Sequence, residues 1–213
     1  GNFKYTAAGA LAPNGKIYFA PCDAQRVLCI DPAAQAVEML EPEMRGTLKK
    51  YVAAGVLAPN GKIYFAPCGA LQVLCVDPVA QTSETLGPEI RGDDKYAAAG
   101  MLAPNGKIYF APCDAQQVLC VDPEARTVEM LGPEMRGNDK YMTAGHLASN
   151  DRIYFAPCGA KQVLCVDFAA QSAEQLGPEL TGGRLYTAAG ALACNGRIYF
   201  APQRADAVLC IDP

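Results

Sequence analysis

The octapeptide NGKIYFAP occupies Asn14–Pro21 and returns unchanged at Asn60–Pro67 and Asn105–Pro112. Altered copies stand at Asn150–Pro157 and Asn195–Pro202. One tyrosine precedes each copy, with spacings of 46, 45, 45 and 45 residues between Tyr5, Tyr51, Tyr96, Tyr141 and Tyr186. A period of about 40–50 residues is typical of stacked supersecondary units, each of which needs its neighbours to bury its apolar surface.

The third repeat predicts four short strands, within Ala98–Leu102, Lys107–Ala111, Gln117–Val121 and Val128–Leu131. These segments are apolar, mostly β-branched or aromatic, and Gly, Pro or Asp-Pro separates them. Asn105-Gly106 predicts a type I′ hairpin turn between the first two strands. No segment has a helical period.

The composition of each strand indicates its place in a sheet. The second and third strands are apolar at nearly every position, so both of their faces need cover. The fourth strand varies most between repeats and is expected to be half exposed, whereas the Ala- and Gly-rich first strand suits a crowded centre. The sequence therefore predicts an all-β fold, a five-bladed β-propeller with four antiparallel strands per blade. The predicted blades of this single domain are approximately 1–46, 47–92, 93–137, 138–182 and 183–213.

The last blade is predicted to lack its outer strand. The chain provides no fourth strand after Val208–Ile211, and Gly1–Lys4 matches only the linker between repeats. An apolar edge of this kind is an aggregation hazard. We expect either that the parent chain continues or that a protein partner covers this edge.

The stretch Gly15–Asp31 resembles the core of an NHL-type propeller repeat. That family has a Gly-x-Val-Tyr-Val strand, a short polar loop, an Arg-Ile pair and a strand that ends in Phe-Asp. This chain departs from it at Pro21 and Ala24, where the family's loop has Asp and Asn. In blade number the chain also resembles tachylectin-like five-bladed lectins. The NHL resemblance implies a propeller that binds protein or RNA, but a fold alone does not establish a function.

Nine of the ten cysteines fall into two repeated positions. Five lie in the middle of the third strands, and Cys22, Cys68, Cys113 and Cys158 follow the Ala-Pro of the loops. The strand and loop positions are too far apart for disulfides, and zinc-type Cys-x₂-Cys pairs are absent. We expect small buried side chains in a reducing intracellular compartment, with the loop cysteines the more exposed. No metal and no cofactor are predicted.

His146 is the only histidine and replaces Ala, Val or Met of the other repeats. A site with five-fold symmetry cannot contain it, so a packed or channel-facing role is expected. Propeller lyases and lactonases need histidines or converging carboxylates on the axis. The chain offers neither, and we predict that it is not an enzyme.

Charged residues and tyrosines repeat in the segments that link the outer strand of one blade to the next blade. These linkers are expected on the same face as the Pro-Cys loops. The candidate binding residues on this face are Tyr5, Arg45, Tyr51, Arg91, Tyr96, Arg136, Tyr141, Tyr186, Cys22, Cys68, Cys113 and Cys158. Two interpretations stay open: a solvated surface copied by duplication, or a set of inter-blade pockets or a docking face.

The net charge is −4, and lysine and arginine are dispersed, which argues against nucleic acid as a partner. No apolar run reaches the ~18 residues of a membrane helix, so direct membrane insertion is not expected. The sequence favours a non-enzymatic scaffold or protein-interaction propeller, a peripheral subunit of an assembly or part of a longer chain, with a protein partner at Val208–Ile211. The alternative is a lectin-like propeller that binds carbohydrate between blades, and a propeller lyase or hydrolase ranks third.

Overall fold

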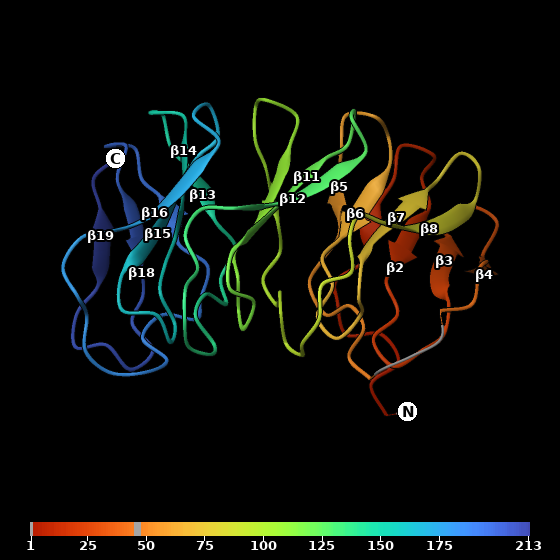
Figure 1. The fold of residues 1–213 in the computed structure, drawn as a ribbon. Helices are drawn as coiled ribbons and strands as arrows, with labels where there is room; N and C mark the ends of the chain where they lie inside the picture. Colours follow the sequence, from red (N-terminus) through yellow and green to blue (C-terminus); the bar gives the residue numbers. More distant parts are fainter. Residues whose placement is uncertain (1, 45–47) are drawn as a thin grey trace.

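The computed structural model describes residues 2–44 and 48–213, which form five antiparallel sheets placed side by side (Figure 1). Blade 1 contains β1 (Ala10–Leu11), β2 (Ile17–Phe19), β3 (Val27–Asp31) and β4 (Ala36–Leu40). Blade 2 contains β5 (Val56–Leu57), β6 (Ile63–Phe65), β7 (Val73–Asp77) and β8 (Thr82–Leu86). Blade 3 contains β9 (Met101–Leu102), β10 (Ile108–Phe110), β11 (Val118–Asp122) and β12 (Thr127–Leu131). Blade 4 contains β13 (His146–Leu147), β14 (Arg152–Phe155), β15 (Val163–Asp167) and β16 (Ser172–Leu176). Blade 5 contains β17 (Ala191–Leu192), β18 (Ile198–Phe200) and β19 (Leu209–Ile211).

Each sheet follows the order of the chain, so every blade is a meander. The all-β, five-bladed propeller is confirmed, as is the missing outer strand of the last blade. The innermost strands are shorter than predicted, because only Met101–Leu102 of the expected Ala98–Leu102 run joins the ladder. In the described ranges there is no helix long and apolar enough to cross a membrane.

The turn after each first strand differs from the sequence prediction. In this turn of blade 3, Gly106 has a positive φ, of 80°, and Asn105 does not, so the predicted type I′ turn is wrong. Pro104 holds φ near −65°, which favours a type I turn followed by a left-handed glycine. The Asn105 side chain has another role: its Nδ2 donates to the Tyr109 hydroxyl at 3.0 Å and to the carbonyl oxygen of Phe168 in blade 4 at 3.1 Å.

Each blade has two apolar faces that pack against different neighbours. We call the face with the Tyr and Cys positions the forward face (Tyr64, Val73 and Cys75 in blade 2) and the opposite face the rear face (Ile63, Phe65, Leu74 and Val76 in blade 2). The forward face of each blade packs on the rear face of the next, and four hydrophobic clusters each join two consecutive blades. Full burial of one such side chain contributes about 1.5–3 kcal/mol, so the joints between blades hold the array together.

The two end faces of the array are uncovered. On the rear face of blade 1, Val37 is 64% exposed, whereas Val128 at the equivalent position of blade 3 is 8% exposed. On the forward face of blade 5, Val208 is 57% exposed, whereas Val118 is fully buried. Figure 1 shows blade 1 (red) and blade 5 (blue) at opposite ends of the array. Within the described residues, therefore, the first and last blades do not meet.

Candidate functional site

The linkers and the Pro-Cys loops lie on one face and hold each other by backbone hydrogen bonds. The amide of Lys50 donates to the carbonyl oxygen of Cys22 in blade 1 at 3.0 Å, and the carbonyl oxygen of Lys50 accepts from the amide of Cys68 in blade 2 at 2.9 Å. Lys95 and Lys140 repeat this pattern at the next two joints. Each linker is thereby inserted between the loops of two blades.

The predicted tyrosines of this face are structural. Tyr51, Tyr96, Tyr141 and Tyr186 are buried, and Tyr5 is half-buried. Their hydroxyls donate to main-chain carbonyl oxygens 21 residues downstream, at 2.9–3.1 Å, as Tyr96 does to Gln117. Burial raises the pKa of Tyr141 to about 12. The four buried rings fill the gaps between their linkers and the blades that follow, and a role of these tyrosines in binding stays a prediction.

The loop cysteines are also buried, contrary to the expectation that they would be the more exposed set. Cys22, Cys68, Cys113 and Cys158 are at most 2% exposed, and all ten cysteines are free thiols. Burial raises the pKa of Cys68 and of Cys113 to about 12. These two side chains are therefore neutral thiols at physiological pH and poor nucleophiles.

Three lysines of the linkers are buried, which the sequence did not indicate. Lys50, Lys95 and Lys140 are at most 4% exposed. The Nζ of Lys95 donates to the carbonyl oxygen of Gly92 at 2.5 Å, and the Nζ of Lys140 donates to that of Gly137 at 2.6 Å. Burial lowers the pKa of all three amines. Of the predicted arginines, Arg91 and Arg136 are exposed, and Arg45 lies outside the described residues.

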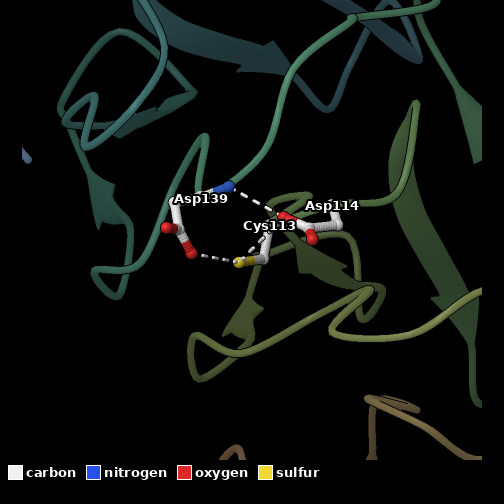
Figure 2. Close-up of side chains that lie close together, drawn as sticks. All are labelled: Cys113, Asp114 and Asp139. Atoms are coloured by element: carbon white, nitrogen blue, oxygen red, sulfur yellow. Dashed lines mark hydrogen bonds between the residues drawn. The ribbon is translucent and has the colours of Figure 1, made fainter. Parts of the chain in front are cut away.

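One joint brings a thiol and two carboxylates together (Figure 2). The ligand atoms of Cys113, Asp114 and Asp139 lie within 4.8 Å of one another. Asp114 Oδ1 accepts from the amide of Asp139 at 2.7 Å, and the Cys113 Sγ lies 3.7 Å from Asp114 Oδ1 and 3.8 Å from Asp139 Oδ1. The other joints have Gly or a basic residue at one of the two acidic positions. Because the thiol is protonated and a carboxylate is already bonded to the main chain, the cluster serves to hold the loop against the linker.

The histidine packs between the last two blades rather than taking part in a cluster of polar groups. The ring of His146, on β13, lies 5.6 Å from that of Phe200 in an edge-to-face arrangement. Its Nε2 is buried without a hydrogen-bond partner among the described residues. Burial lowers the pKa of His146, and a backbone hydrogen bond with Gly190 opposes this shift.

Replacing His146 by Met, the residue of blade 3 at this position, is expected to make stability less dependent on pH. A folded-state pKa below the unfolded value means that protonation favours the unfolded chain, so wild-type stability is full above about pH 6.5 and falls as the pH drops below it. Urea unfolding at pH 8 and pH 5 measures this difference. The variant should lose less stability than the wild type on acidification. An equal loss in both proteins would contradict a lowered pKa of His146 in the folded state.

Three equivalent pockets lie where linkers meet blades on the linker face. Their volumes are about 580, 420 and 520 Å³, and they are lined in turn by Tyr5, Tyr51 and Tyr96 with neighbouring loop residues. Three polar side chains that line the third pocket have partners within the chain. The Tyr96 hydroxyl and the Lys95 Nζ are bonded to main-chain carbonyls, and the Gln117 Nε2 donates to the carbonyl oxygen of Gly132 at 2.5 Å.

A different hollow lies at blade 5, in the place of the missing strand. In blade 4, Ala173 of the outer strand packs on Gly132 of blade 3, where a Cβ added to the glycine would lie 2.7 Å from the Ala173 Cβ. In blade 3, Val128 covers Gly87 in the same way. The equivalent Gly177 has nothing within 4 Å of such a Cβ.

This hollow, which we call the strand slot, has a volume of about 280 Å³. Its lining includes Leu176, Gly177, Leu180, Leu209 and Ile211. On one side it is bounded by β19, whose outer edge pairs with no strand in the part of the chain that the structure describes. The predicted edge at Val208–Ile211 is thus half of an apolar groove whose other half is blade 4.

No family model matches this chain, and no curated protein matches it. Among solved structures, virginiamycin B lyase from Staphylococcus aureus is similar, with a TM-score of 0.68, 10% identity, and coverage of 100% of this chain and 71% of that chain. A streptogramin B lyase has a TM-score of 0.64 and 14% identity, over 98% of this chain and 68% of that chain. An auxiliary nutrient binding protein from Bacteroides ovatus has a TM-score of 0.59 and 13% identity, over 99% of this chain and 56% of that chain. At these identities the likeness shows the β-propeller fold alone.

Proposed function

We propose that this propeller is a non-enzymatic interaction module that accepts a β-strand from a protein partner at blade 5. The observation that carries the proposal is the strand slot. Each of β3, β7, β11 and β15 pairs with an outer strand, whereas β19 pairs with none among the described residues. Strand addition provides affinity through main-chain hydrogen bonds and specificity through the pockets that alternate side chains enter. The partner segment is an extended strand with a small apolar residue aimed at Gly177.

The chemistry of the described residues supports a binding role over catalysis. The thiols of Cys68 and Cys113 have raised pKa values, and His146 packs against Phe200. The amines of Lys95 and Lys140 are bonded to main-chain carbonyls. The repeated pockets are the basis for the carbohydrate-binding alternative. It ranks second because three polar side chains that line the third pocket, those of Lys95, Tyr96 and Gln117, are already bonded within the chain. We also assign the repeat to the NHL type, on the sequence resemblance of Gly15–Asp31.

A peptide that copies residues 124–134, which include the β12 strand, is expected to bind the 213-residue chain. By the register of blade 3, its Val128 pairs with Val121, the counterpart of Ile211, and faces the preceding blade at the position of Gly177. Hydrogen exchange should then slow at Leu209–Ile211. Calorimetry gives the dissociation constant.

The matched control is the same peptide with Val128→Asp. A carboxylate forced into the apolar slot should weaken binding at least ~10-fold. On the protein side, Gly177→Val fills the slot and should abolish binding. The proposal is wrong if the Asp peptide binds as well as the original, or if exchange slows elsewhere and not at β19.

A further inference from the structure

We propose that the rear face of blade 1 and the forward face of blade 5 are the two walls of a gap that two further blades of this repeat fill, which completes a seven-bladed ring. The inference rests on the proposed function, because the first strand of the added pair is the strand that enters the strand slot of blade 5. It goes further because it names what covers both ends of the array. In such a pair, the rear face of the first added blade covers the forward face of blade 5. The forward face of the second added blade covers the rear face of blade 1.

The apolar residues of the two walls are those that the four internal joints bury. Blade 5 presents Tyr199, Val208 and Cys210, and the equivalent Tyr64, Val73 and Cys75 of blade 2 are at most 2% exposed. Blade 1 presents Ile30 and Val37, which are half-buried and exposed, whereas Val121 and Val128 of blade 3 are buried. The walls are therefore the two halves of one interface type that the molecule already forms four times.

The polar contacts of the joints are also incomplete at the ends. At the joint of blades 1 and 2, Asn14 Nδ2 donates to the Pro78 carbonyl oxygen at 2.9 Å, and Gln81 Nε2 donates to the Tyr18 hydroxyl. In blade 5, Asn195 Nδ2 reaches its own Tyr199 hydroxyl, at 3.1 Å, and in the described chain no following blade offers it a carbonyl. In blade 1, Gln35 stands at the Gln81 position and is exposed. The forward face of blade 5 thus has the Asn and Tyr of such a joint without a following blade to bond to. The rear face of blade 1 has the Gln of such a joint without a preceding blade.

Two of the similar solved structures suggest the size of the gap. The five blades span 71% of the virginiamycin B lyase chain and 68% of the streptogramin B lyase chain. Five of seven equal units make up nearly the same share, and propellers usually close with four to eight blades. A gap of two units admits two blades. A second copy of the chain brings five, so it cannot enter the gap in register.

Chains with five, six, seven and eight repeats test the inference. The longer three are the 213-residue chain followed by copies of residues 169–213, 124–213 or 79–213, and each copy continues the period after Pro213. All carry Cys194→Pro in every copy, which restores the residue of the first three blades and removes the other exposed thiol. The thiol at the last Cys210 position then reports whether the final forward face is covered.

One thiol should react with Ellman's reagent under native conditions in the five- and six-repeat chains, and none in the seven-repeat chain. The eight-repeat chain should again expose at least one. The melting temperature should rise more from six to seven repeats than from five to six, because the seventh blade adds two joints at once.

A reactive Cys210-position thiol in the seven-repeat chain, or full protection at six or eight repeats, would overturn the inference. So would a five-repeat chain that elutes as a dimer with Cys210 protected, since a second copy would then cover the walls. The peptide experiment on the five-repeat chain does not depend on ring closure. If the peptide binds but the seven-repeat chain stays open, ring closure is wrong and strand acceptance stands. If the seven-repeat chain closes but the peptide does not bind, strand acceptance from a partner is wrong and ring closure stands.

Discussion

Replacing Tyr109 by alanine is expected to lower the free energy of unfolding by about 3–5 kcal/mol, and the same change at Tyr199 by only about 1 kcal/mol. The two tyrosines hold the same place in blades 3 and 5. Tyr109 is fully buried in the joint with blade 4, and its hydroxyl is bonded to Asn105 and to Gln171 at 3.0 and 2.7 Å. Tyr199 is half-buried on the uncovered forward face, with one bond to Asn195.

Urea denaturation followed by far-UV circular dichroism measures both losses, and Tyr199→Ala is the matched control for Tyr109→Ala. The difference between the two variants isolates the cost of the joint, because the repeats around them are nearly identical. Equal losses would mean that the forward face of blade 5 is covered in solution. Light scattering on the same samples would then show whether self-association provides the cover.

Gly132→Ala and Gly177→Ala form a second matched pair, with a large effect expected only at Gly132. Both glycines have a φ close to +81°, of 81° and 82°, so an alanine at either position costs about 1–2 kcal/mol in backbone strain. At Gly132 the added Cβ would also lie 2.7 Å from the Ala173 Cβ and 3.0 Å from its carbonyl oxygen. Overpacking of this kind adds about 1–3 kcal/mol.

Thermal or urea unfolding of the two variants checks this pair. Gly132→Ala should lose roughly 2–5 kcal/mol, and Gly177→Ala should stay within the cost of the backbone strain alone. A Gly177→Ala variant as unstable as Gly132→Ala would show that something already occupies the strand slot. The strand-acceptor proposal would then lose its basis.

The repeat alone predicted the sheets, their order and the missing outer strand, because those features depend on patterns within one period. Strand apolarity separated the buried β7 and β11 from the half-exposed β8 and β12. The hairpin type was wrong because Asn105 is placed by a carbonyl group of Phe168 in another blade, and no local rule accounts for that partner.

The burial of the linker residues was not predicted, for a similar reason. Lys95 and Tyr96 read as surface residues of a polar linker, yet their main chain is held between the loops of two blades. Their burial depends on contacts between repeats, which composition within one repeat does not reveal. The uncovered edge at Val208–Ile211 was predicted because the repeat period shows that a strand is missing there, and its role in binding stays a proposal.

The linkers have a mechanical consequence. Because Lys50 donates to the loop of blade 1 and accepts from the loop of blade 2, bending the two blades apart on that face must break main-chain bonds on both sides of one residue. Lys95 and Lys140 place the same double tie at the next two joints. Hinge motion is therefore opposed at each of these three joints. Blades 1 to 4 should respond to an applied load as one stiff body.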